Sequence, residues 1–456
     1  MAKALTLASL LAVFVPYAAA ADSRAPDQLT LVVVGDVGLN RNQLPVDPKG
    51  VVEGKGVYPW AEMSAEIKDL IDGDLNFMNL ETVVTDRNDL SPGNKGQKSP
   101  YLFRTHPKGV AHLCKLGFNL VSSANNHAYD YGEQGVVETV KHLEAARRSG
   151  MLRYAGIGNT REAASKPVRM KRKWAKVAFS AIGIVTNMLK HHRATDKKPG
   201  TLGYRTEEDW KHAVNRLHDE TEGAQLRLLS IHYGVERDIR TDERQKRDYR
   251  WAVGERGVDV LIGHHAHVVR GVELHKGRLL FYGLGNSLIR GARDMGTSAA
   301  LHGCCDYGLL SRVHLAKGKD QHYSVAAIEA IPVIDMHRRP RPFPDKEQSK
   351  TRIEVLNVLA ESLDDSAAQS VGVRFMVRED GTGLYCAKDA ATLGGNIGAL
   401  CKDYQPAGEP SQLARKYVSR APSPSLKSKR KWAADKVKRK RAGKGKHKRK
   451  GKRRRR

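Results

Sequence analysis

The chain has 456 residues, of which 40% are apolar, and its formal net charge is +28. This length and apolar content support a large buried core, so they exclude a chain that is disordered throughout. The charge is unevenly placed, because residues 426–456 hold 19 Lys and Arg against the single acid Asp435, which leaves only +10 for the rest. The body of the chain is therefore mildly basic, and the excess charge belongs to a C-terminal tail.

Residues 1–21 have the pattern of a secretory signal peptide. Lys3 supplies a positive start, residues 4–15 are almost all apolar, and the four alanines 18–21 offer small residues for cleavage before Asp22. Retention as a membrane anchor is the alternative, because about 20 apolar residues span a bilayer and this run reaches that length only with its alanines. Either interpretation predicts an exported protein, in the periplasm, outside the cell or on the outer face of the cytoplasmic membrane.

Short apolar runs alternate with amphipathic stretches between residues 29 and 331, which predicts one α/β domain with a largely buried sheet. Runs rich in Val, Leu and Ile are expected to form central strands at residues 29–34, 75–80, 120–123, 177–182, 226–231 and 258–262. Amphipathic spacing predicts helices at 133–148 and 243–256. A hairpin is expected at 271–283, turning at Lys276–Gly277.

The composition changes after Pro332, and residues 332–403 are expected to form a small appendage. It should contain an Arg- and Pro-rich loop at 336–344, a helix at 351–363 and a hairpin that turns at Asp380–Gly381. Residues 404–456 are predicted to be a disordered linker and Lys/Arg-rich tail, because the end of the chain has too few apolar side chains to form a core.

Five cysteines leave the disulfide state open. Cys114 is expected to be a buried free thiol in a helix. The other four could form two bridges, in which Cys304 and Cys305 each pair with Cys386 or Cys401, because adjacent cysteines rarely bond to each other. Four reduced structural thiols are the alternative, since a domain of this size does not need disulfides for stability.

Polar residues that can bind metal follow five of the predicted strands, at the edge where the carboxyl ends of strands and their loops bind ligands in open α/β sheets. These residues are Asp36, Glu81, Asn126 with His127, His232, and His265 with His267. Taken singly, each is most simply a helix cap, a turn residue or a buried structural side chain. Their repeated placement at strand ends favours a shared site instead.

Carboxylate and imidazole ligands suit one or two divalent ions such as Mn, Zn or Fe, and a bridging carboxylate can hold two ions about 3.5 to 4 Å apart. We expect His265 and His267 to lie on an extended backbone, where alternate residues point to the same side. The sequence therefore predicts a metal site with the capacity to activate water.

The order of several sequence blocks resembles that of one protein family. The blocks VVVGDVGLNR, NFMNLETVVTD, ANNHAYDYG, LSIHYGVE, IGHHAHVVRGVEL and YGLGN run in order between residues 29 and 289. They resemble the CapA family of capsule and poly-γ-glutamate biosynthesis proteins, which is similar to the calcineurin-like metallophosphoesterases. The resemblance implies a four-layer α/β/β/α sandwich.

The resemblance also implies roles for individual residues. Asp36 and His267 would bind one ion, Glu81 would bridge, and the second ion would be held by Asn126, His232 and His265. His127 would donate a proton to the leaving group, so it is predicted to be catalytic with Asp36 and Arg41, and Arg41 and Asn286 would line the pocket. Gly38 departs from the phosphoesterase pattern, which has a histidine there, and Glu81 replaces the usual bridging aspartate.

The implied function is the synthesis or processing of an anionic polymer such as poly-γ-glutamate, with membrane-associated capsule synthesis proteins as partners. A general metallophosphoesterase is the first alternative, and a polyanion-binding assembly protein without catalysis is the second. The basic tail would bind anionic polymer or an anionic surface, or simply be solvated. Nucleic acid is not the expected partner, because export separates the tail from it and Trp432 is the tail's only aromatic residue.

Overall fold

A computed structural model of the chain describes residues 27–39, 44–94, 100–183, 192–204, 207–290 and 302–422. The predicted signal peptide, Arg41 and the Lys/Arg-rich tail from residue 423 lie outside the described residues. Within these ranges, no helix is long and apolar enough to cross a membrane.

The first sheet is mixed and has ten strands. Its main path runs in the order β22 (Met376–Val377), β23 (Gly383–Cys386), β19 (Tyr323–Ile334), β18 (Gly308–Lys317), β1 (Gln28–Gly38), β4 (Leu75–Leu80), β7 (Leu120–Ser122) and β8 (Arg153–Ala155). Two short strands pair beside this path, β17 (Asn286–Ile289) with β1 and β20 (Arg341–Pro342) with β19. Strands β1, β4, β7 and β8 are parallel, so their carboxyl ends lie at the same edge.

The second sheet has seven strands and faces the first. Its order is β10 (Val168–Arg172), β11 (Ala175–Gly183), β13 (Leu226–His232), β14 (Val260–His264), β16 (Arg278–Phe281), β15 (Val272–His275) and β21 (Ser370–Gly372). Strands β11, β13, β14 and β16 are parallel. The remaining described strands pair in three two-stranded ribbons: β2 (Gly50–Glu53) with β3 (Gly56–Pro59), β5 (Val83–Val84) with β6 (Arg104–Thr105), and β9 (Ile157–Gly158) with β12 (Gly200–Thr201).

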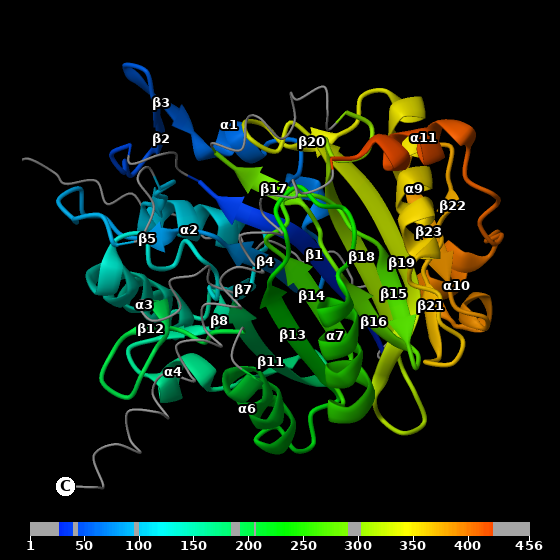
Figure 1. The fold of residues 1–456 in the computed structure, drawn as a ribbon, viewed down its shortest axis with the longest axis horizontal. Helices are drawn as coiled ribbons and strands as arrows, with labels where there is room; N and C mark the ends of the chain where they lie inside the picture. Colours follow the sequence, from blue (N-terminus) through cyan, green and yellow to red (C-terminus); the bar gives the residue numbers. More distant parts are fainter. Residues whose placement is uncertain are drawn as a thin grey trace, which may run out of the picture.

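Helices cover the outer faces of both sheets (Figure 1). Near the first sheet are α1 (Trp60–Ser64), α2 (Pro107–Lys115) and α3 (Gly132–Arg148), with the short η1 (Lys68–Leu70). The second is covered by α6 (Glu207–Asp219) and α7 (Glu243–Arg256), with α4 (Arg161–Ser165) beside them. The C-terminal part adds α9 (Lys346–Glu361), η2 (Ala390–Thr392), α10 (Gly395–Cys401) and α11 (Gln412–Arg420).

The period-two alternation of the strands produces the layers. Along β1, Leu31 and Val33 point into the core between the sheets, while Val32 and Val34 point to the helices outside. Phe77 and Phe179 meet across the two sheets with their ring centroids 5.9 Å apart. The predicted four-layer α/β/β/α sandwich is therefore confirmed.

Most predicted elements agree with the structure. Each of the six predicted central strands coincides with an observed strand, with ends that differ by a few residues, and the helix predicted at 243–256 has those bounds. The hairpin turn at Lys276–Gly277 has both residues at positive φ, which gives the strand twist that two-residue hairpins need. The hairpin at Asp380–Gly381 is also present, between β22 and β23.

The C-terminal part differs from the prediction in three respects. Residues 332–403 extend both sheets, because β23 pairs with β19 and β21 pairs with β15. Helix α9 begins at Lys346, five residues earlier than predicted, where Asp345 caps it by accepting bonds from two backbone amides. The prediction of disorder from residue 404 is wrong for its first part, because Ser411 caps α11 and this helix packs against α9.

The predicted disulfide pairing is wrong. The structure contains bridges between the adjacent residues Cys304 and Cys305 and between Cys386 and Cys401. Strand β23 and helix α10 bring Cys386 and Cys401 together in a small apolar cluster, which sequence spacing could not reveal. Cys114 is free and partly buried in α2, as predicted.

Glu329 on β19 fastens the C-terminal part to the first sheet. Its carboxylate accepts bonds from Arg378, at 2.7 Å, and His314 Nε2 lies 3.0 Å from its other oxygen. Burial raises the pKa of Glu329, but these two partners outweigh it and hold the pKa at about 2. A carboxyl whose pKa is lowered on folding stabilises the protein above its unfolded pKa and loses that contribution as the pH falls toward the folded pKa.

Replacing the Glu329 carboxylate tests whether its charge holds the C-terminal part to the first sheet. We expect Glu329→Gln to lower the free energy of unfolding by about 2 kcal/mol at neutral pH, and the deficit to shrink as the pH falls from about 5 toward 2. Urea unfolding of the wild type and the variant across this range measures both effects. Glu222→Gln, at an exposed acid, is the control and should change little. A deficit that stays constant with pH would mean that packing, not charge, holds the segment.

Candidate metal centre

The carboxyl ends of the central strands of both sheets deliver polar side chains to one place. Asp36 lies near the end of β1, beside Asn79 of the parallel strand β4, and Glu81 directly follows that strand. In the second sheet, His232 ends β13 and lies opposite His264 at the end of β14. Because these strands are parallel within each sheet, their ends meet at one edge of the sandwich.

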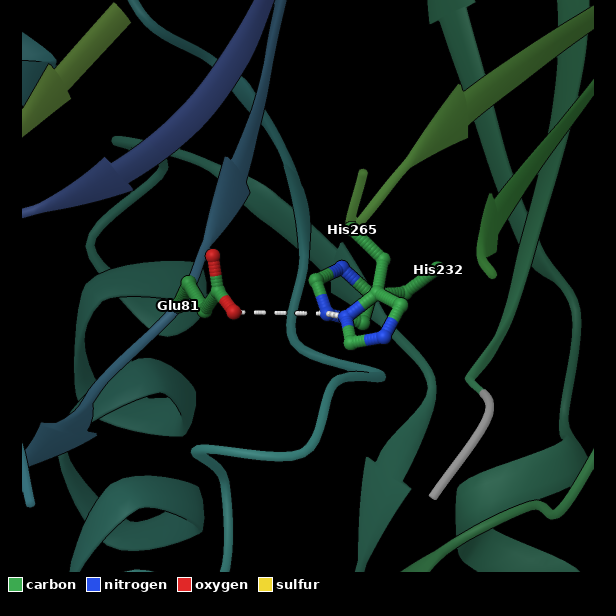
Figure 2. A group of neighbouring side chains, drawn as sticks. All are labelled: Glu81, His232 and His265. Carbon is green, nitrogen blue, oxygen red and sulfur yellow. Dashed lines mark hydrogen bonds and ion pairs between the residues drawn. The ribbon is translucent and has the colours of Figure 1, made fainter. Parts of the chain in front are cut away.

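Glu81 lies at the centre of this cluster. It belongs to two groups whose potential ligand atoms all lie within 4.8 Å of one another, one with Asp36 and His267 and the other with His232 and His265. Figure 2 shows the second group, in which both imidazoles approach the Glu81 carboxylate and His232 Nε2 lies 3.3 Å from Glu81 Oε1. The arrangement would suit two adjacent cations that share one carboxylate.

The carboxylate of Glu81 has the surroundings expected of a metal ligand. It is fully buried, and neither of its oxygens accepts a hydrogen bond. Leaving a buried charge without partners is costly, so buried carboxylates are normally paired, hydrogen-bonded or bound to metal. Oxygen and imidazole nitrogen donors in this number fit a divalent transition ion.

Burial and neighbouring charges shift the pKa values of several groups in the centre. Burial and the nearby carboxylate of Asp36 raise the pKa of Glu81 above its ordinary value. The pKa of Asp36 is also raised by burial, but His267 and His232 outweigh this and hold it below its usual range. Burial lowers the pKa of His232 to about 4 and that of His265 well below its ordinary value, so both imidazoles are neutral and able to bind a metal.

Amide side chains orient the ligands. Asn79 donates to Asp36 Oδ1 at 2.7 Å, and its amide nitrogen also lies 3.1 Å from His232 Nδ1. Asn126 Oδ1 lies 2.7 Å from His232 Nε2, so the predicted amide ligand faces the second group. Asn286 Oδ1 lies 2.8 Å from His267 Nδ1, which places this predicted pocket residue beside the first group.

The backbone at His265 and His267 is not extended, although the sequence had suggested an extended segment there. His265 and His267 have φ values of 86° and 57°, so the segment turns after β14. Positive φ is uncommon outside glycine and marks a constrained turn. The turn still directs both rings to the centre, with His265 Nδ1 3.1 Å from His232 Nε2 and His267 Nδ1 3.3 Å from Asp36 Oδ2.

His127 lies beside the ligands and is held by an acid. Its Nδ1 is 2.7 Å from Asp130 Oδ2, and its Nε2 is 3.8 Å from Glu81 Oε1. Asp130 also accepts the backbone amide of Phe103, whose ring lies 4.3 Å from the imidazole of His127. One ring nitrogen is thereby fixed to a carboxylate while the other faces the centre, which suits a proton donor.

Sequence reasoning assigned no role to several supporting residues. Asn79 was visible as a polar residue in an otherwise apolar strand, and Asp130 as the acid three residues after His127. His264 gave no separate signal, yet it is fully buried, has no hydrogen-bond partner for either ring nitrogen, and stacks on Phe77. Predicted Arg41 lies outside the described residues, so its position relative to the centre stays a prediction.

A buried arginine supports the loop that follows His232. Arg270 is 1% exposed and donates to the carbonyl oxygens of Val235 and Asp238 and to the side chain of Gln245. Gln245 in turn donates to the carbonyl oxygen of Tyr233. The loop is also joined to the histidine turn, because the backbone amide of residue 237 donates to the carbonyl oxygen of residue 266 at 2.8 Å.

Residues 30–290 match the family described as bacterial capsule synthesis protein PGA_cap. The chain belongs to this family. The match covers more than half of the chain and contains every described ligand of the centre. The PGA_cap family is part of the metallophosphoesterase-like superfamily, in agreement with the four-layer sandwich.

Curated relatives carry related names. The PGA biosynthesis protein CapA of Bacillus subtilis is 27% identical over 71% of this chain and 75% of its own length. The capsule biosynthesis protein CapA of Bacillus anthracis is 27% identical over 58% of this chain and 60% of its own length. A probable polyglutamine synthesis accessory protein of Mycobacterium tuberculosis is also 27% identical, over 54% of this chain and 61% of its own length.

Two solved structures show a weaker likeness. A hypothetical protein from Thermus thermophilus covers 65% of this chain and 97% of its own, with 16% identity and a TM-score of 0.36. The NAD nucleotidase NadN of Haemophilus influenzae covers 74% of this chain and 63% of its own, with 12% identity and a TM-score of 0.37. These scores are too low to support a functional argument.

Glu81 offers a direct test of the shared-carboxylate arrangement. We expect Glu81→Gln to lower the affinity for both ions. Asp36→Asn should weaken mainly the binding of the ion in the first group, and His265→Ala mainly that of the ion in the second. Elemental analysis and calorimetric titration with Mn²⁺ measure this. Without metal, Glu81→Gln should unfold at the same or a higher temperature than the wild type, because it removes a buried carboxyl group whose oxygens accept no hydrogen bond, and added Mn²⁺ should stabilise it less. Equal metal content in all three variants would contradict the assignment.

Proposed function

We propose that this PGA_cap protein acts outside the cytoplasmic membrane in making or processing an anionic polymer of the poly-γ-glutamate type. The names of the curated relatives support the polymer, because they refer to PGA, capsule or polyglutamine synthesis. The signal-like residues 1–21 support the location. Membrane-associated proteins of capsule synthesis are the partners that this role requires.

The reaction proposed is metal-dependent hydrolysis or transfer at the centre around Glu81. One or two divalent ions of Mn, Zn or Fe would be held by Asp36, Glu81 and His267 and by Glu81, Asn126, His232 and His265. When bound, such ions lower the pKa of water and polarise the carbonyl or phosphoryl group under attack. The observation that carries the proposal is the convergence of two ligand groups on one buried carboxylate without hydrogen bonds.

The side chains of the protein would then hold the reacting groups in place and donate a proton to the leaving group. In hydrolysis of an amide link, water adds to the carbonyl carbon, the bond from carbon to nitrogen breaks, and the amine leaves with a proton. His127 is placed to donate that proton from Nε2, because Asp130 holds the opposite ring nitrogen. Asp130 would also stabilise the charged imidazole, which general acid catalysis requires. In transfer, an amine or hydroxyl of a second chain would replace water.

Gly38 favours this role over general phosphoesterase activity. The position that carries a histidine in phosphoesterases of this type has no side chain here, and a Cβ atom added to Gly38 would lie 3.2 Å from the carbonyl oxygen of Glu81. Among the residues that the structure describes, the first ligand group contains one imidazole, that of His267.

Polymer length is the readout for the reaction. Incubation of long poly-γ-glutamate with the protein and Mn²⁺ should shorten or rejoin chains, as measured by gel filtration with light scattering. We expect Asp36→Asn to abolish the change and His127→Gln to slow it by roughly 10²- to 10⁴-fold while metal content stays at the wild-type level.

Two results would favour the alternatives. Turnover of a chromogenic phosphodiester with Mn²⁺, without any change in the polymer, would assign the centre to phosphate esters. Polymer binding that is unaltered by Asp36→Asn and His265→Ala, in protein that purifies without metal, would indicate an assembly protein without catalysis.

A further inference from the structure

The hairpin of β10 and β11 carries an unbalanced positive charge. Residues 166–176, called the basic hairpin below, contain six Lys and Arg and no acid. Lys173 forms an ion pair with Asp74 at 2.8 Å. Arg169, Lys171 and Lys176 are exposed, and no acid among the described residues forms an ion pair with them. Most of this charge is therefore directed to solvent and not used within the fold.

Two of these cations lower the stability of the hairpin. Lys171 lies directly opposite Lys176 in the antiparallel register, where like charges repel. β10 is an edge strand, and lysines on edge strands prevent pairing between molecules. That explanation covers Lys171 but not Lys176, which lies on the inner strand β11. A binding role accounts for both.

The turn of the basic hairpin displays a large apolar side chain. Trp174 is 64% exposed and lies next to Lys173, whose φ of 48° forms the tight turn between the strands. Tryptophan combines an apolar ring with a polar N–H group, and it is enriched where proteins meet the headgroup layer of membranes. An exposed tryptophan surrounded by cations is typical of a surface that binds anionic lipid.

The described residues begin at the same end of the sandwich as this turn. The backbone amide of Lys317 donates to the carbonyl oxygen of Asp27, the first described residue, at 2.9 Å. From there, β18 turns into β19, whose first residue Tyr323 donates to the carbonyl oxygen of Gln225 at 3.0 Å. Gln225 donates to the carbonyl oxygen of Lys176 at 2.8 Å. Asp27 therefore lies at the end of the sandwich that carries the basic hairpin.

The metal centre lies at the opposite end of the same strands. β11 begins at Ala175, next to Trp174, and ends at Gly183, which is paired with the ligand His232. Eight residue steps along a strand span about 26 Å. The basic hairpin and the centre thus occupy the two ends of the second sheet.

We infer that this end of the sandwich binds an anionic lipid bilayer, with Trp174 in the headgroup layer and the basic hairpin on the phosphates. A flexible polycarboxylate would match the cations but would offer no apolar layer for the indole ring. The adjoining hollow also contains Asp219 and Glu222, so the attraction comes from the hairpin and not from the hollow. Bound in this way, the protein directs its metal centre away from the membrane. The inference does not depend on the proposed function.

Vesicle binding by the full-length exported chain tests whether the positive charge of the basic hairpin contributes to lipid binding. The triple variant Arg169→Gln, Lys171→Gln, Lys176→Gln should bind mixed phosphatidylcholine and phosphatidylglycerol vesicles more weakly, by about fivefold for each cation removed. It should also unfold at the same or a higher temperature, because the repulsion between strands is gone. The matched control Lys49→Gln, Lys108→Gln, Lys115→Gln removes equal charge from exposed lysines elsewhere and should bind like the wild type. The basic tail contributes equally to every protein compared.

Fluorescence quenching tests the tryptophan. Lipids brominated near the headgroups should quench the wild type more than Trp174→Phe, and the difference should disappear with vesicles of phosphatidylcholine alone. Unchanged vesicle affinity of the triple variant, or equal quenching of both proteins, would overturn the inference. Loss of poly-γ-glutamate binding with unchanged vesicle binding would also overturn it, because the hairpin would then bind the polymer. None of these measurements requires turnover. The membrane inference and the proposed reaction can therefore fail independently of each other.

Discussion

One buried carboxylate sets the requirements for the rest of the site. Glu81 has no access to solvent and no hydrogen-bond donor, so its charge must be neutralised by a proton or by a cation. The four nearest ligand side chains come from β1, β13 and the turn after β14. These elements belong to different sheets, so the two sheets must be packed face to face before the ligands can meet. The apolar core between the sheets is therefore also what assembles the centre.

The second sheet holds its ligands through buried polar contacts as well as strand pairing. Arg270 and Gln245 bind three backbone carbonyls of the loop after His232, and this loop bonds to the histidine turn. Hydrogen bonds from a charged group contribute about 1.5–3 kcal/mol each when the geometry is good. Such bonds keep a turn with two non-glycine residues at positive φ in place, which strand pairing alone could not do.

Local patterns in the sequence were enough to predict the strands and the cluster of polar side chains at their ends, but not the contacts between distant segments. The cluster could be predicted because each of its members follows an apolar run, and strand ends converge in parallel sheets. The turn at His265 and His267 was missed because nothing in the residues HAH distinguishes a turn from a strand. The pairing of Cys386 with Cys401 and the packing of α11 on α9 depend on tertiary packing, which composition does not encode.

The absence of a side chain at Gly38 bears on the chemistry of the first ligand group. A histidine there would begin with a Cβ atom 3.2 Å from the Glu81 carbonyl oxygen, tighter than ordinary contact, so the backbone of Glu81 would have to shift. β1 approaches residue 81 closely, and the backbone amide of Glu81 donates to the carbonyl oxygen of Val37, so the backbone disfavours a second nitrogen donor at position 38. Two carboxylates and one imidazole remain, a set richer in oxygen than in nitrogen. Carboxylate oxygens suit hard ions such as Mn²⁺, so under the proposed function the backbone path of β1 would favour such an ion in the first group.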